Sequence, residues 1–194
     1  MTAATQRTTS FQAVDLAHIG VFAALIAALA IVPALNIGPV PITLQTLGVA
    51  LAGLCLGPWR GCAAVLLYIA VGVAGLPIFA KGGSGFATLL GPSGGYLLAF
   101  PLAALLTGFV AVWAMRRGLS RTTPVFFFLG LLASRYLIIL PLGVMGMMRA
   151  LEWDFGKAFV TDMAFWPGDA AKSVIAAVVA YAVHRAFPRL LVQR

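Results

Sequence analysis

Six apolar stretches constrain the fold of this chain more than any other feature. In 194 residues they cover about residues 17–35, 43–58, 61–79, 94–115, 123–148 and 169–187. An α-helix rises about 1.5 Å per residue, so about 20 apolar residues cross a hydrocarbon core about 30 Å thick. With 62% hydrophobic residues, little of the chain is left for a soluble domain. The sequence therefore predicts an all-α integral membrane protein, a single domain (1–194) built as a bundle of six transmembrane helices.

The positions of Lys and Arg predict how the bundle is oriented, because these residues are enriched in short cytoplasmic loops. With six spans, both termini share one side with the second and fourth loops. That side would hold one acid, Asp15, and eight arginines: Arg7, Arg60, Arg116, Arg117, Arg121, Arg185, Arg189 and Arg194. The other side would hold Lys81, Arg149 and Lys157 with Glu152, Asp154 and Asp162. We expect both termini, including an N-terminal tail (1–16), to be cytoplasmic, which explains the net charge of +8 without a nucleic-acid partner.

The stretch FWPGDAAKSV (165–174) places Asp169 and Lys172 where the last apolar stretch begins. In a structural interpretation, Asp169 caps the free N–H groups of the helix, and Lys172 extends its ammonium back to the membrane interface. In a functional interpretation, the carboxylate accepts hydrogen bonds from ligand N–H groups and the ammonium donates to a carbonyl or carboxylate. The spacing alone leaves both interpretations open.

Two outward-facing segments contain further candidates for a binding site. The glycine-rich segment 75–100 allows its backbone to approach a ligand closely, while interleaved Phe and Leu residues indicate that it packs as a cap over a pocket. Residues 38–48 place Thr43, Gln45 and Thr46 in apolar surroundings, where they bond within the bundle or contact a ligand.

Arg135 is unusual because it lies deep inside an apolar stretch. Counted from residue 123, it is on the order of 18 Å into the helix. A charge at that depth costs several kcal/mol unless it faces a polar cavity or a partner. We expect its side chain to point inward, toward a ligand or toward an acid such as Asp169, and the sequence does not distinguish these.

The first apolar stretch has small residues at the spacing that lets two helices approach closely in lipid. These are Ala23 with Ala27, and Ala24 with Ala28. They mark a candidate docking face for a partner helix.

An intramembrane hydrolase is an alternative function, because GGSG (82–85) matches the G-x-S-G pattern of intramembrane serine proteases. The partner base of Ser84 would be His184. A helix carries His184 about 22 Å away from Asp169 toward the opposite side, whereas nucleophile and base must approach to about 3 Å. We therefore reject the dyad and interpret His18 and His184 as polar caps near the inner interface.

Several ordered motifs resemble one family. PITLQTLGV, GLPIF followed by GGSG, GPSGGYLLAF and WPGDAAK closely resemble signature stretches of BioY, the biotin-binding S component of energy-coupling factor (ECF) vitamin transporters. The resemblance runs from the first to the last apolar stretch. It implies a bundle in a bacterial cytoplasmic membrane that captures biotin from outside, in a pocket roofed by the first and third loops.

The resemblance also implies which residues contact the ligand. The family's PGDxxK motif supplies contacts and falls here on Asp169 and Lys172. A polar side chain near the third loop also contributes, and the candidates are Ser84, Thr88, Ser93 and Tyr96.

Partners are implied for the energy supply. The sequence has no G-x-x-x-x-G-K-[ST] stretch to cradle nucleotide phosphates, so ATP would be used by partner subunits. The resemblance implies a transmembrane coupling protein docking on the alanine face, and two cytoplasmic ATPases. A solitary or oligomeric biotin transporter without that module is the alternative. We expect no cofactor or metal site, with Cys55 and Cys62 as buried thiols.

Overall fold

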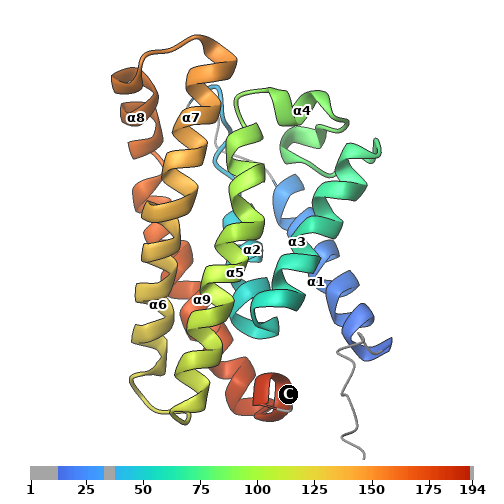
Figure 1. The fold of residues 1–194 in the computed structure, drawn as a ribbon, viewed down its shortest axis with the longest axis vertical. Coiled ribbons are helices and arrows are strands. Elements are labelled where there is room, and N and C mark those ends of the chain that lie inside the picture. The colour runs from blue at the N-terminus through green and yellow to red at the C-terminus, as the bar shows by residue number, and fades with distance from the viewer. Residues whose placement is uncertain (1–12, 33–37, 193–194) are drawn as a thin grey trace, which may run out of the picture.

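The structure, a computed structural model, describes residues 13–32 and 38–192, and in this part of the chain the regular elements are helices (Figure 1). The long ones are α1 (Ala13–Ile31), α2 (Gln45–Leu56), α3 (Pro58–Val73), α5 (Gly94–Arg116), α6 (Thr123–Ser134) continued through η2 (Arg135–Ile139) into α7 (Leu140–Leu151), and α9 (Trp166–Ala186). The short ones are η1 (Ala80–Gly82), α4 (Ala87–Leu90), α8 (Phe155–Met163) and α10 (Arg189–Val192). The all-α prediction is confirmed, and each predicted stretch overlaps a helix. Of the predicted tail (1–16), residues 1–12 lie outside the described residues, and residues 13–16 already belong to α1.

Three helical segments of the described chain are long and apolar enough to cross a membrane: Ala13–Ile31, Gly94–Arg116 and Thr123–Leu151. The apolar helices α2 and α3 are shorter, because Gly57 turns the chain at a positive φ of 80° and Pro58 starts α3 at once. The third stretch ends at Val73 rather than at 79, since the chain leaves the helix at Ala74 and Gly75 follows with a φ of 111°.

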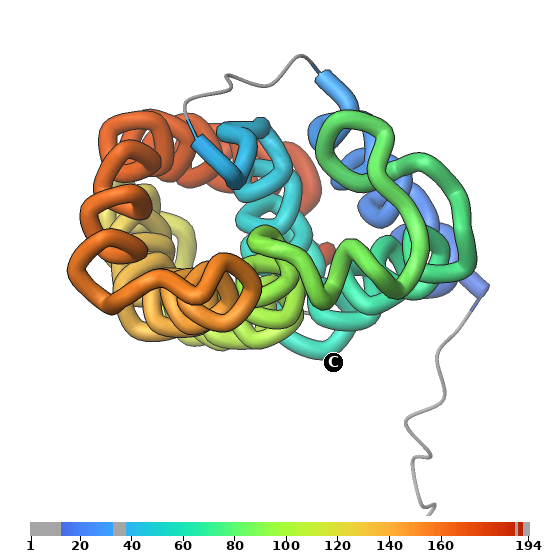
Figure 2. Tube along the Cα trace, turned by 90° about the horizontal axis from the view of Figure 1, so that it is seen from above, coloured from blue at the N-terminus to red at the C-terminus, as the bar shows by residue number. Residues whose placement is uncertain are grey.

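The helices form two groups joined by a central pair. Seen along the bundle, α1, α3 and α4 lie on one side and α6 to α9 on the other, with α2 and α5 between them (Figure 2). Helices α2 and α5 pack against each other; α5 also packs against α3 and α6, and α2 against α1 and α9. This arrangement brings the starts of α2, α5 and α9 together at one end of the bundle.

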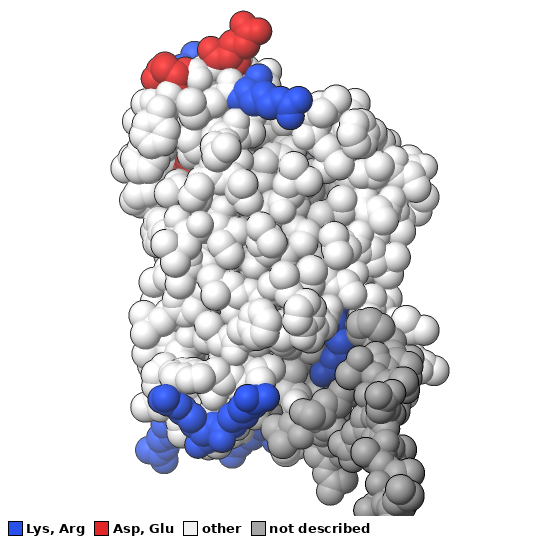
Figure 3. All heavy atoms as spheres, viewed as in Figure 1, with Lys and Arg blue, Asp and Glu red and all other residues white. Residues whose placement is uncertain are grey.

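The two ends of the bundle differ in charge. The start of α1 and the C-terminus lie at the same end, opposite α4 and α8 (Figure 1). Basic side chains gather at the end that carries the C-terminus, whereas both signs occur at the other end (Figure 3). Between the two ends, the visible face is almost without charge, as a surface in contact with lipid requires.

The four alanines of α1 do not share one environment. Ala23 is buried in the hydrophobic core and Ala27 packs against that core, so both serve contacts within the chain. Ala24 and Ala28 are exposed. The exposed pair is therefore the part of the expected docking face that a partner can reach.

Helices α5 and α7 approach each other closely at Gly95 and Gly146, and this contact fixes the start of α5. Tyr96, which follows Gly95, lines the cavity described below. A Cβ atom added to Gly95 would overlap the carbonyl oxygen of Leu142, and one added to Gly146 would lie 2.7 Å from the Cα of Gly95. We predict that Gly95→Ala lowers the free energy of unfolding by about 1–3 kcal/mol, because the backbones must separate. Thermal unfolding in detergent measures this effect.

Gly20→Ala is the matched control, because a Cβ atom there meets nothing within 4 Å and alanine favours a helix. Equal losses of stability in the two variants would contradict the close approach.

Candidate functional site

A cavity of about 230 Å³ opens at the end of the bundle that carries α4 and α8. Residues before and within α2, the segment around η1 and α4, the start of α5 and the start of α9 surround it. Its polar lining residues are Thr43, Gln45, Thr46, Lys81, Thr88, Ser93, Tyr96, Asp169 and Lys172. Its larger apolar lining residues are Val40, Phe79, Leu97, Phe100, Ile139 and Phe165. Both loops expected to roof a pocket contribute to the lining.

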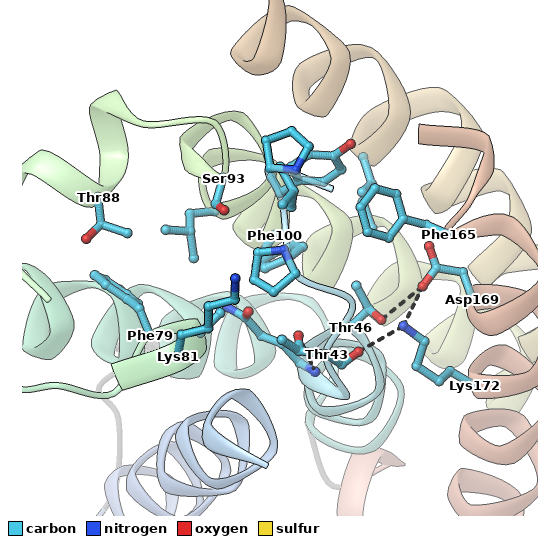
Figure 4. A pocket seen from close by; sticks show the side chains of 18 residues that line it. Thr43, Thr46, Phe79, Lys81, Thr88, Ser93, Phe100, Phe165, Asp169 and Lys172 are labelled. Atoms are coloured by element: carbon cyan, nitrogen blue, oxygen red, sulfur yellow. Dashed lines mark hydrogen bonds and ion pairs between the residues drawn. The ribbon is translucent and has the colours of Figure 1, made fainter. Parts of the chain in front are cut away.

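Asp169 and Lys172 form the polar end of the cavity (Figure 4). The Lys172 ammonium lies 2.6 Å from Oδ1 of Asp169 and donates to the carbonyl oxygen of Thr43 at 3.0 Å. The hydroxyl of Thr46 donates to the same Oδ1 at 3.3 Å. Because Thr43 precedes α2 while both charged residues belong to α9, the contacts join two segments distant in sequence.

The structural interpretation of Asp169 as a helix cap, one of the two left open by the sequence, is wrong. Helix α9 begins at Trp166, after Phe165 and with Pro167 in its first turn, and no side chain caps it. The backbone N–H of Asp169 already donates to the carbonyl of Phe165 at 2.8 Å, so this residue lies inside the helix. Its carboxylate is therefore available for contacts with neighbouring elements.

The structural interpretation of Lys172, in which its ammonium extends to the membrane interface, is also wrong. The residue is only 8% exposed, and its ammonium is held by Asp169 and the Thr43 carbonyl. The ammonium stays buried because its departure would remove one cationic partner from the buried carboxylate of Asp169, and an incompletely paired buried charge is costly.

Arg135 pairs with two acids rather than one. Its Nε donates to Oδ2 of Asp169 at 2.7 Å, and its Nη2 donates to Oδ2 of Asp162 at 2.6 Å. Arg135 begins the π-helical segment η2, and π-helical turns occur frequently at functional sites. Of the two alternatives for this residue, pairing is the one that the geometry realises.

Asp162 belongs to the site although the sequence indicated it only as one of the acids of an outer loop. It is fully buried in α8 and accepts hydrogen bonds from the Tyr96 hydroxyl at 2.6 Å and from Nε1 of Trp166 at 3.1 Å. Asp162 lies seven residues before Asp169, a spacing that would place both acids on one face of a continuous helix. A turn at Ala164 and Phe165 separates α8 from α9, so this spacing alone does not explain why the two acids lie close together.

The four charged side chains form one cluster, which we call the buried charge cluster: Arg135, Asp162, Asp169 and Lys172. Each is at most 8% exposed. Two positive and two negative charges balance, so the cluster is neutral as a whole. Such balance is what makes four buried charges tolerable in an apolar bundle.

The wall opposite the charge cluster is also polar. Thr88 and Ser93 line it together with Lys81, which adopts a left-handed backbone conformation (φ 58°) (Figure 4). Ser84 is exposed and does not line the cavity; its carbonyl oxygen accepts from the Thr88 hydroxyl at 2.9 Å. Lys81 was not identified from the sequence as a site residue, because nothing local distinguishes it from a solvated loop lysine.

Gln45 has a supporting contact as well as a place in the lining. Its side-chain amide donates to the Tyr68 hydroxyl at 2.9 Å, and that hydroxyl donates to the carbonyl of Ile78 at 3.3 Å. These bonds connect α2 and α3 to the segment that leads into η1. Gln45 therefore helps to position the third loop through the Tyr68 hydroxyl.

The serine and histidine of the rejected dyad lie at opposite ends. Ser84 precedes α4, whereas His184 lies in the last turn of α9 near the C-terminus (Figure 1). His184 is fully buried, and its Nε2 is 2.9 Å from the carbonyl oxygen of Leu54. His184 therefore links α9 to α2 inside the bundle, and the prediction that it caps a helix at the interface is wrong. Cys55 and Cys62 are both free thiols; Cys55 is buried as expected, whereas Cys62 is only half-buried.

The chain is similar in sequence to a family of known proteins along almost its whole length. Residues 3–189 match the model of the BioY family. The chain is 37% identical to "Biotin transporter BioY" of Rhizobium etli, with 91% of this chain and 96% of the relative covered. It is 34% identical to "Probable biotin transporter BioY" of Bacillus subtilis, with 89% and 91% covered.

A solved structure has the same fold. It is described as the S-component for biotin from an ECF-type ABC transporter, and it superposes with a TM-score of 0.83 at 26% identity. The match covers 91% of this chain and 95% of the other.

The buried charge cluster predicts a large effect of removing one of its cations. Arg135→Met leaves Asp162 without its cationic partner and Asp169 with Lys172 alone, so we expect the free energy of unfolding to fall by about 3–5 kcal/mol. Thermal unfolding of the purified protein in detergent measures the change.

Arg149→Met is the matched control, because Arg149 is exposed in the same continuous helix and forms none of the ion pairs of the described residues. Its unfolding should stay close to that of the unchanged protein. Similar small shifts in both variants would contradict the role of Arg135.

Proposed function

We propose, because the chain belongs to the BioY family, that it binds biotin and serves biotin uptake as the substrate-capturing subunit of an ECF-type transporter. It is a transport protein rather than an enzyme. The observation that carries the proposal is the cavity, which combines apolar walls with the charge pair of Asp169 and Lys172 at one end.

The chemistry of biotin suits this cavity. Its ureido ring presents two N–H donors and one carbonyl acceptor, and its thiophane ring requires apolar surroundings. The Asp169 carboxylate has lone pairs to accept an N–H donor, and the Lys172 ammonium has a third proton to donate to the ureido oxygen. Phe100 and Phe165 supply apolar surface beside them.

The charge distribution favours one orientation of the ligand. The buried charge cluster is already neutral, so a neutral ureido ring suits it better than a carboxylate does. Lys81 lies across the cavity, is exposed and forms none of the ion pairs found among the described residues. We therefore place the valerate carboxylate toward Lys81, with the hydroxyl of Ser93 beside it; the Thr88 hydroxyl lines the same wall but donates its proton to the Ser84 carbonyl. Ser84 takes no part in this assignment.

A titration of biotin tests the ureido end. Asp169→Asn and Lys172→Met should each weaken binding tenfold or more, because removal of one partner leaves a buried group unpaired at about 1–3 kcal/mol. Lys157→Met removes an exposed lysine of α8 outside the cavity and should leave the affinity unchanged. Isothermal calorimetry on monodisperse protein provides the measurement; unchanged affinity in both well-folded variants would rule out this assignment.

The same titration tests the orientation when biotin is compared with biotinamide, which lacks the carboxylate. Lys81→Met should weaken biotin binding several-fold and leave biotinamide binding almost unchanged. A loss of equal size for both ligands, or for biotinamide alone, would place the carboxylate elsewhere.

The proposal includes a place for the chain in the cell. We propose that six helices cross a bacterial cytoplasmic membrane, with both termini in the cytoplasm and the cavity facing outward. The basic end of the bundle, which carries the C-terminus, supports this orientation (Figure 3). No cofactor is assigned to the chain, and ATP would be hydrolysed only by partner subunits.

For the coupling protein we propose a docking face around Ala24 and Ala28. Both are exposed on α1, and their small side chains permit close approach of another helix. Ala24→Leu should reduce copurification of the coupling module at least several-fold and leave biotin affinity unchanged.

Ala182→Leu, on the exposed side of α9, is the matched control. Equal copurification of all three proteins would remove this face from the proposal. Biotin transport by the chain in vesicles lacking any ATPase would favour the solitary or oligomeric transporter instead.

A further inference from the structure

A second, larger hollow lies at the basic end of the bundle. It has a volume of about 1080 Å³ and runs between the turn from α2 to α3, the last turns of α5, and α10. Its apolar walls include Trp59, Phe109, Val112 and Trp113, and its rim carries Arg116 and Arg117. We propose that this groove binds one anionic phospholipid, with the phosphate at the two arginines and an acyl chain along the apolar walls.

The first argument is the lack of counter-charge. The chain has five acidic residues, of which Asp162 and Asp169 belong to the buried charge cluster and two lie between α7 and α8 at the other end. The fifth, Asp15, forms an ion pair with Arg60 at 3.2 Å. Among the described residues, therefore, Arg116 and Arg117 have no carboxylate partner at the groove, which leaves both guanidinium groups available to an external anion.

The second argument is the geometry of the cationic rim. The guanidinium carbon of Arg117 lies 3.8 Å from the ring centroid of Trp113, so the group stacks on the indole. Stacking leaves the N–H groups at the edge of the guanidinium plane available, and this fork matches the oxygens of a phosphate. A tryptophan under an arginine also marks the depth at which phospholipid headgroups lie.

The third argument is the exposed apolar wall. Trp59, Phe109 and Trp113 are 67%, 50% and 43% exposed, and the rings of Trp59 and Phe109 meet edge to face at 5.9 Å. Large exposed aromatic side chains next to unpaired cations suit a molecule that is apolar along its length and anionic at its head.

The groove is preformed rather than collapsible. Gly108 of α5 lies against the backbone of Gly57 and Pro58, where any added Cβ atom would clash. Arg60 fixes the floor, since its Nη2 donates to the carbonyl oxygen of Leu190 in α10 at 2.8 Å and its Nε donates to that of Leu56 at 3.0 Å. A rigid groove requires little ordering when a ligand binds.

These observations distinguish the anionic phospholipid from simpler occupants. A free phosphate would neutralise the arginines and leave the aromatic wall in contact with water or other lipid. A zwitterionic lipid would cover the wall but would bring a cationic group to a site that already has two arginines. Of these three occupants, the anionic phospholipid is the one that satisfies both parts of the groove.

Native mass spectrometry of the full chain in a mild detergent tests the proposal, with phosphatidylglycerol or phosphatidylcholine added at equal concentration. We expect one phosphatidylglycerol to be retained at least tenfold better than phosphatidylcholine. The double variant Arg116→Gln/Arg117→Gln should lose that preference by roughly tenfold or more, as two charges near a lipid surface predict. Val112→Trp, which fills the groove without a change of charge, should also reduce retention.

The matched control is Arg121→Gln/Arg185→Gln, which removes two exposed arginines from the same end but outside the groove. Retention within twofold of the unchanged protein is expected. Equal losses in the two double variants would show a general effect of net charge, and equal retention of both lipids would show an apolar site; either result would overturn the proposal. Displacement of the lipid by millimolar inorganic phosphate would show a simple anion site, and displacement by a copurifying protein would show a docking surface; each of these would overturn it as well.

Discussion

Four buried charges hold the cavity end of this molecule together. Arg135 binds Asp162 and Asp169 at 2.6 and 2.7 Å, and Asp169 binds Lys172 at 2.6 Å. Burial of any one of these groups alone would cost several kcal/mol, whereas together they compensate one another. Because the four residues come from η2, α8 and α9, and Lys172 also binds the segment before α2, this compensation fixes the relative positions of four parts of the chain.

The same cluster shapes the chemistry of the cavity. A ligand that meets Asp169 and Lys172 meets a dipole with no net charge, which suits a polar, neutral group better than an ion. Asp162 reaches the cavity indirectly, through Arg135 and through the hydroxyl of Tyr96. Helix α8, which packs against α7 at this end, is thereby connected electrostatically to the residues that we propose contact the ligand.

The two ends of the bundle present two different surfaces. The end with the cavity carries charges of both signs and has the charge cluster beneath it, while the opposite end carries mostly arginines beside exposed tryptophans (Figure 3). Close glycine contacts stabilise the packing near both: Gly95 against Gly146 at the first, and Gly108 against Pro58 at the second. These contacts are short-range and steric, so they keep their geometry in an apolar medium where the hydrophobic effect contributes little between helices.

The amino-acid sequence by itself determined the helical class, the approximate place of each long helix, the separation of charge between the two ends, and the spacing of Asp169 and Lys172. Hydropathy, turn residues and charge are properties of single segments, so they can be read without knowledge of the packing. Only the tertiary structure decided what those residues contact. It placed Lys172 against the carbonyl of Thr43, 129 positions away, brought Asp162 to Arg135, set Lys81 rather than Ser84 at the cavity, and buried Ala23 while it exposed Ala24. These pairings depend on how helices cross and where loops fold over them, and that arrangement follows from contacts among distant segments instead of from any local pattern.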